Sequence, residues 1–297
     1  MKVNRIRQNV LPVLAAFIWG TAFVAQSVGA DYVEPFTFNT ARSAIAFLFL
    51  LVLCLVRRKV QKGVVESATR SWKDLAVGGT CCGVALTVAS FLQQKGLETT
   101  TSGKAGFITA LYIVIVPILG VFLKKKAPRT IWISVALAVV GLYCLCITED
   151  FTITSGDFYI LLCAFCFSIH ILVIDHFSPN VDGVRMSCIQ FFTAGILCGV
   201  PMLLFESPNL TDICAAWAPI AYAGIMSCGV AYTLQVVAQK HTDPTVASLL
   251  LSLESVISVL AGWVLLGQAL SPRELTGCAL SFCAIILAQL PDRASRA

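Results

Sequence analysis

Ten apolar runs of about twenty residues each, joined by short polar links, most constrain what this chain can fold into. A helix of about 20 apolar residues is long enough to cross the roughly 30 Å hydrocarbon core of a bilayer. We therefore predict an all-α membrane protein with ten transmembrane helices. The predicted spans are residues 10–28, 36–56, 75–94, 104–123, 130–148, 157–175, 184–204, 217–238, 245–266 and 274–290.

Composition supports the same class. Of the 297 residues 58% are hydrophobic and only 12% are charged, which leaves no room for a sizeable soluble domain. The net charge of +5 comes mainly from basic residues in the short loops between spans. Lipid headgroups explain such loops better than nucleic acid does, so we expect a bilayer and no nucleic-acid partner.

The two halves of the sequence resemble each other. Residues 88–126 placed over residues 230–268, at a constant offset of 142, give 11 identities in 39 positions, and the pattern VAxxLQ occurs in both. In this register Tyr112 lies opposite Glu254. Because each half carries five spans, an odd number, the second half is predicted to be inverted in the membrane. The predicted repeats are residues 10–148 and 157–290.

The distribution of basic residues predicts the orientation. If both termini are cytoplasmic, 17 of the 21 Lys and Arg residues lie on that side, three (Lys95, Lys104 and Arg273) lie on the other, and Arg42 lies within a span. Positively charged loops remain in the cytoplasm. We therefore predict a multi-pass protein of the cell membrane with both termini cytoplasmic.

A single carboxylate, Glu254, lies near the middle of the apolar stretch Thr245–Gly267. A charge at that depth costs at least about 2.5 kcal/mol to insert, so the side chain should face protein or a water-filled cavity. Because burial disfavours the charged form, Glu254 is a candidate for proton coupling or for binding an amine. The alternative is a protonated carboxyl bonded to a neighbouring helix. Tyr112, its repeat counterpart, is a second cavity candidate.

Two other polar positions lie inside the first two spans. Trp19 falls mid-span, away from the interfacial belt where Trp usually anchors, and Gly20 beside it permits close contact. Both are candidates for the cavity wall, where Trp19 would stack on substrate, or for simple helix packing. Arg42 either binds an anionic group, pairs with a carboxylate or extends to the outer surface.

The remaining candidates have weaker signals. His170 is the one His well inside a span, either a proton relay or a packing partner. Gln93 and Gln235 match in the repeat and either bond substrate or cap helix carbonyls. Pro117 lacks an N–H group and should loosen its helix, as a hinge or as a static kink.

Small residues recur at spacings that let helices approach closely. Gly79 and Gly83 form a G-x-x-x-G motif in the third span. Matching stripes lie in the fifth and tenth spans, at Ser134, Ala138 and Gly141 and at Gly277, Ser281 and Ala284. The stripes either pack against each other or form the contact of a homodimer.

Several segments resemble the EamA-type drug/metabolite transporters: FIWGTAF at residues 17–23, GFITALY at 106–112, PILG at 117–120, SLES at 252–255 and GWVLLGQ at 262–268. Ser255 and Gln268 depart from the usual Pro and Glu of that family. The resemblance covers nearly the whole chain. It implies ten helices, a central cavity between the halves, alternating access, and transport of small metabolites such as amino acids, with export the commoner direction.

No enzyme constellation is present in the sequence. There is no phosphate-binding Gly-rich loop with Lys, no metal-spaced His pair, and no nucleophile with a base. We therefore predict no catalysis, cofactor or metal, and transport driven by a gradient. The alternatives are a membrane scaffold or sensor protein without flux of its own, and an importer of a different metabolite.

Overall fold

The structure is a computed structural model that describes residues 2–60, 69, 71–100, 102–124, 128–146, 154–266 and 271–289. Within these ranges every regular element is a helix. In the first half they are α1 (Lys2–Ala30), α2 (Pro35–Val60), α4 (Trp72–Leu97), α5 (Ser102–Ala110), α6 (Tyr112–Phe122) and α7 (Arg129–Cys146). The expected repeat ends at residues 148 and 290, and Gln268, lie outside the described residues.

The second half contains the same succession of long helices with more interruptions. Its elements are α8 (Ser155–Phe177), η1 (Ser178–Asn180), α9 (Gly183–Phe205), α10 (Leu210–Ala215), α11 (Trp217–Tyr222), the π-helical η2 (Ala223–Ala231), α12 (Tyr232–Gln239), α13 (Pro244–Leu251), α14 (Leu253–Leu266) and α15 (Pro272–Gln289). Local caps begin several of them, because a side-chain oxygen there accepts a hydrogen bond from an otherwise unpaired backbone N–H. Thr154 and Asp157 form a capping box on α8, and Asp182 caps α9.

Eight helical segments among the described residues are long and apolar enough to cross a membrane. They coincide with eight of the ten predicted spans. The remaining two predicted spans correspond to α7, whose apolar segment Arg129–Cys144 is shorter, and to α15. The chain is therefore an all-helical, multi-pass membrane protein over the part that the structure describes.

The bundle is apolar outside and carries polar side chains inside. Large apolar residues such as Leu48, Val52 and Leu203 are exposed on α2 and α9, as expected of surfaces that face lipid. Buried polar residues instead include Gln94, Ser168 and Gln190. Polar residues buried in the interior of a membrane bundle are candidates for a functional site.

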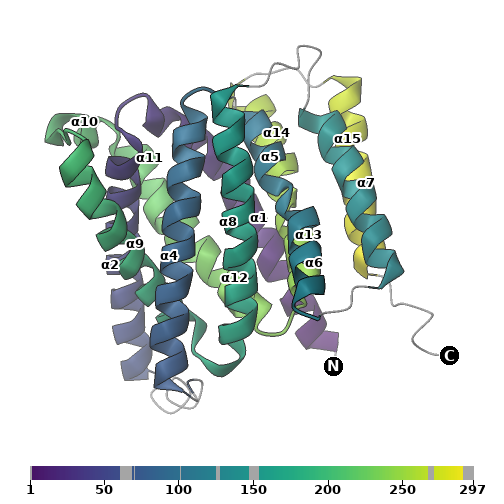
Figure 1. The fold of residues 1–297 in the computed structure, drawn as a ribbon, viewed down its shortest axis with the longest axis horizontal. Coiled ribbons are helices and arrows are strands. Elements are labelled where there is room, and N and C mark those ends of the chain that lie inside the picture. The colour runs from purple at the N-terminus through teal and green to yellow at the C-terminus, as the bar shows by residue number, and fades with distance from the viewer. Residues whose placement is uncertain are drawn as a thin grey trace.

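The packing pairs helices from the two halves. α1 packs against α14, and α8 packs against α5 and α6, while α2 packs along α9. Figure 1 shows α2 and α9 at one end of the bundle and α7 with α15 at the other. Helices of the first and second halves therefore alternate through the core.

Glycines permit the closest approaches. A Cβ added at Gly83 on α4 would lie 2.6 Å from Thr193 Cβ and 2.7 Å from the Gln190 carbonyl oxygen on α9. Gly79 makes the same kind of contact with Ile189. The G-x-x-x-G motif therefore lies at the α4–α9 interface, as its spacing indicated.

The matched stripes on the fifth and tenth spans also meet within the chain. A Cβ added at Gly141 on α7 would lie 2.7 Å from Ser281 Oγ on α15. This contact joins α7 to α15 along their small faces. The stripes are therefore used for packing inside one chain.

Candidate functional site

Two helices are interrupted at matching places in the two halves. α5 ends at Ala110 and α6 begins at Tyr112, with Leu111 in a turn between them. In the second half α13 ends at Leu251 and α14 begins at Leu253, with Ser252 in the turn. In membrane transporters, interrupted helices commonly line substrate sites near the bilayer midplane. Tyr112 and Glu254 each lie in the first turn after an interruption.

Tyr112 and Glu254 contact each other directly. The Tyr112 hydroxyl donates a hydrogen bond of 2.9 Å to Glu254 Oε1, across 142 residues of sequence. Both side chains are buried, with 3% and 5% of their surface exposed. Glu254 therefore faces the protein interior, as its position in an apolar stretch required.

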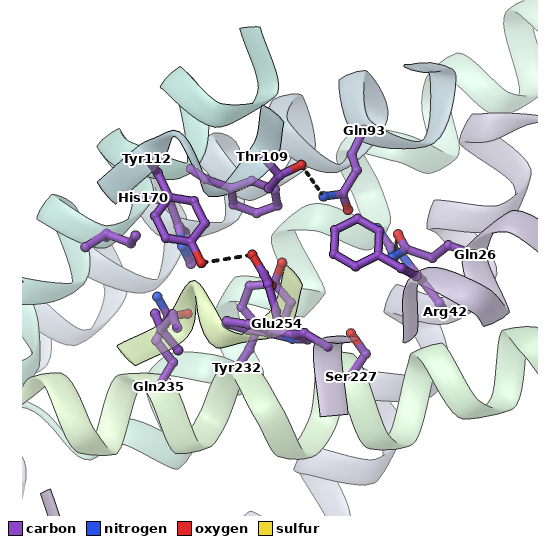
Figure 2. A pocket seen from close by; sticks show the side chains of 15 residues that line it. Gln26, Arg42, Gln93, Thr109, Tyr112, His170, Ser227, Tyr232, Gln235 and Glu254 are labelled. Atoms are coloured by element: carbon purple, nitrogen blue, oxygen red, sulfur yellow. Dashed lines mark hydrogen bonds between the residues drawn. The ribbon is translucent and has the colours of Figure 1, made fainter. Parts of the chain in front are cut away.

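A cavity surrounds this pair (Figure 2). Its volume is about 30 Å³, room for a few waters at about 10–15 Å³ each. It is lined by Trp19, Phe23, Gln26, Arg42, Gln93, Thr109, Tyr112, Phe167, His170, Ile171, Ser227, Tyr232, Gln235, Leu251 and Glu254. Of the eight residues that the sequence indicated for a cavity, seven lie in this lining.

Gly20 is the exception. A Cβ there would lie 2.6 Å from Ile257 Cβ and 2.7 Å from the Glu254 carbonyl oxygen. Gly20 thus lets α1 approach the backbone of α14 closely at Glu254 and Ile257, which is the packing alternative for this residue. Pro117 is buried within α6. The helix interruption lies six residues before it, at Leu111.

Arg42 has a neutral partner. Its Nη1 donates 2.8 Å to Gln26 Oε1, and its Cζ lies 5.4 Å from the centroid of the Phe38 ring. No ion pair among the described residues includes Arg42, whose surface is 5% exposed. The guanidinium is therefore buried and has no carboxylate partner in the described part of the chain, and it lines the cavity.

The other predicted residues complete the polar lining. His170 Nε2 lies 2.9 Å from Gln190 Oε1 on α9. Gln93 Nε2 donates 3.4 Å to Thr109 Oγ1. Gln235 Oε1 is buried with no hydrogen-bond partner in the described part of the chain.

Sequence reasoning missed eight lining residues: Phe23, Gln26, Thr109, Phe167, Ile171, Ser227, Tyr232 and Leu251. Two of them matter most. Gln26 is the hydrogen-bond partner of Arg42. It could have been found from the sequence, because it is a polar amide inside a predicted span, as Gln93 is. Tyr232 lies at the aromatic centre of the site, with its ring centroid 4.6 Å from that of Trp19.

Comparisons with known proteins agree with this architecture. The EamA-like transporter family matches residues 8–147 and 154–290. The chain is 30% identical over 295 residues to an uncharacterized transporter of Archaeoglobus fulgidus, covering 97% of this chain and 87% of the relative. It is 24% identical to a chloroplastic WAT1-related protein of Arabidopsis thaliana, covering 93% of this chain and 68% of that one.

A solved crystal structure shares the fold. It superposes with a TM-score of 0.78 at 20% identity, covering 98% of this chain and 99% of the other. Together with two family matches that span most of the sequence, this leaves one conclusion: the chain belongs to the EamA-like transporter family.

Proposed function

We propose that this protein is a secondary-active transporter of the cell membrane that moves small metabolites by alternating access through the central cavity. The substrates are amine-bearing or zwitterionic molecules such as amino acids, and the direction is export. The direction comes from the family resemblance alone. Ten helices form two inverted five-helix repeats, residues 10–148 and 157–290, with both termini cytoplasmic.

The observation that carries the proposal is that an acidic side chain, Glu254, and a basic side chain, Arg42, line the same buried cavity. Glu254 has a tyrosine and Arg42 an amide as hydrogen-bond partner, and neither belongs to an ion pair among the described residues. Buried charges are normally paired with an opposite charge. Figure 2 draws Arg42 and Gln26 on one side of Glu254, with Gln235 on the other. The ammonium group of a zwitterion would pair with Glu254, and its carboxylate would pair with Arg42.

The contacts between the halves support a two-fold relation between the repeats, and the odd number of spans in each half makes that relation an inverted one. Gly83 meets Gln190 and Thr193, and Gly224 meets the Arg42 carbonyl oxygen and Ile45. Equivalent contacts therefore recur with the roles of the halves exchanged. Tyr112 and Glu254, which match in the repeat, touch each other. Residues related by a two-fold axis meet in this way only on the axis.

Glu254 is the candidate for proton coupling. A carboxyl that meets water from one side and then from the other can bind a proton and release it across the membrane. Movement of one repeat against the other around a fixed site would expose it alternately. Pro117 remains a hinge candidate in the helix that carries Tyr112, although the nearby interruption at Leu111 offers a second place for bending.

The test is flux in sealed vesicles. Full-length protein reconstituted in proteoliposomes is given a mixture of radiolabelled amino acids and an imposed pH gradient. We expect uptake above that of empty vesicles, faster with the gradient, and loss of the gradient effect in Glu254→Gln. Glu98→Gln, which changes a surface carboxylate paired with Lys95, is the matched control. Wild-type rates in Glu254→Gln contradict the coupling role, and an absence of flux from folded protein favours the scaffold or sensor alternative.

A further inference from the structure

Two buried polar atoms in the cavity that Glu254 lines have no hydrogen-bond partner among the described residues. Among the described residues no hydrogen-bond partner exists for Gln235 Oε1 or for His170 Nδ1, although these residues are only 2% and 0% exposed. Both residues line the same cavity as Glu254. Buried polar atoms without partners are rare in proteins, and each one calls for an explanation.

The bond to Gln190 fixes what His170 offers to the cavity. Gln190 is placed with its Oε1 facing His170 Nε2 at 2.9 Å, and since an amide oxygen only accepts hydrogen bonds, this arrangement assigns the proton to Nε2. In the neutral imidazole the other nitrogen then carries a lone pair. His170 Nδ1 is therefore an acceptor, like Gln235 Oε1 and the Glu254 carboxylate.

Aromatic rings line the same cavity as these acceptors. Trp19 and Tyr232 have ring centroids 4.6 Å apart, and the Tyr232 ring lies 5.8 Å from that of His170. Phe167 lies 6.5 Å from His170 on the same helix. Aromatic faces attract cations of every substitution pattern. Three hydrogen-bond acceptors favour a primary ammonium over a quaternary one, because a primary ammonium carries three N–H donors and a quaternary ammonium carries none.

We propose that Glu254, Gln235 and His170 form a primary-ammonium subsite, in which Gln235 Oε1 and His170 Nδ1 select R–NH₃⁺ over methylated amines. Gln190, which lies outside the cavity lining, is a positioning residue that holds the His170 tautomer. This inference rests on the proposed function and specifies the amine end of its substrate.

Binding of a matched amine series tests the subsite. Purified full-length protein is titrated with butylammonium, dimethylbutylammonium and butyltrimethylammonium, and ligand-dependent thermal stabilisation gives the dissociation constants. We expect butylammonium to bind at least about tenfold more tightly than butyltrimethylammonium, the difference expected for one hydrogen bond to a charged group. Equal affinities, or tighter binding of the quaternary ion, overturn the proposal without any variant having to fold.

Variants assign the selectivity to residues. Gln235→Met and His170→Leu should each bring the ratio of the two constants down by about fivefold or more, because each removes one acceptor. His170→Asn should keep most of the ratio, because Asn Oδ1 takes the place of His Nδ1. Ser168→Ala should leave the ratio unchanged, because within the described ranges that hydroxyl bonds only to the Ala164 carbonyl oxygen of its own helix. An unchanged ratio in both acceptor variants contradicts the assignment.

Gln190 is tested through His170. Gln190→Leu should lower the ratio in the wild-type background and have no further effect in the His170→Asn background, since the tautomer then no longer matters. Equal effects in both backgrounds indicate a merely structural role and overturn the assignment of Gln190. If proteoliposomes show flux but the protein does not prefer primary amines, the subsite is contradicted and the proposed function is not. If the protein prefers primary amines but shows no flux, the proposed function is contradicted and the subsite is not.

Discussion

The hydrogen bond between Tyr112 and Glu254 predicts a specific energetic coupling between the two halves. Tyr112→Phe removes the only donor that reaches the carboxylate among the described residues, at 2.9 Å and in a nearly fully buried place. Hydrogen bonds to charged groups contribute about 1.5–3 kcal/mol in proteins, but side-chain bonds within membranes average about 0.6 and reach about 1.7 kcal/mol. Because both partners of this bond are buried, we expect the upper part of the membrane range, about 1–1.7 kcal/mol.

A double-mutant cycle measures that coupling. The four proteins are wild type, Tyr112→Phe, Glu254→Leu and the double variant, unfolded in bicelles with increasing SDS. The loss of stability from Tyr112→Phe should fall by about 1 kcal/mol or more once Glu254 is already Leu. In the control Glu254→Gln the acceptor oxygen remains, so most of the coupling should persist. Additivity within about 0.3 kcal/mol would refute the contact.

Three further predictions concern the surrounding structure. Gly20→Ala should lower the free energy of unfolding by about 1–3 kcal/mol, because its Cβ would lie 2.6 Å from Ile257 Cβ; unfolding in SDS measures it, and an unchanged midpoint contradicts the close contact. Asp182→Ala should lower the free energy of unfolding by about 1–2 kcal/mol, because it removes the cap of α9. Arg57→Gln breaks only the ion pair with Asp182 and should lower it by less than about 1 kcal/mol. A larger loss in Arg57→Gln than in Asp182→Ala is evidence against the cap. Arg42→Gln should weaken the binding of amino acids about tenfold more than the binding of the matching amines that lack a carboxylate. Thermal-shift titrations measure both affinities, and an equal loss for the two kinds of ligand argues against carboxylate binding by Arg42.

Much of the architecture follows from local sequence signals. Apolar runs separated by capped turns predict where helices begin and end, because each helix in lipid satisfies its own backbone hydrogen bonds. Glu254 and Tyr112 could be singled out since a polar group at bilayer depth is costly and the repeat places them opposite each other. A close helix approach at Gly83 could be expected from the G-x-x-x-G spacing, although the spacing does not identify α9 as the partner.

Other features depend on tertiary packing. No Gly or Pro marks the interruptions at Leu111 and Ser252, and Pro117 on α6 comes six residues after Leu111. The partner of Arg42 could not be chosen from sequence, because Gln26 becomes its neighbour only when α1 and α2 are placed side by side. Likewise, Tyr232 lines the site because one particular face of α12 is directed to the cavity. The sequence does not determine that face, since α12 carries polar residues on more than one side.

Accessibility of the cavity from the two sides of the membrane tests the central claim most directly. Thr109, a cavity-lining residue that is 1% exposed, is replaced by Cys in otherwise unchanged protein. Sealed proteoliposomes of known orientation are treated with a membrane-impermeant maleimide from inside or from outside, and labelling at position 109 is quantified by mass spectrometry of its peptide. Alternating access predicts labelling from each side, with rates that a transported amine shifts in opposite directions. Labelling from neither side, or from one side only under every condition, contradicts a transport path through Glu254.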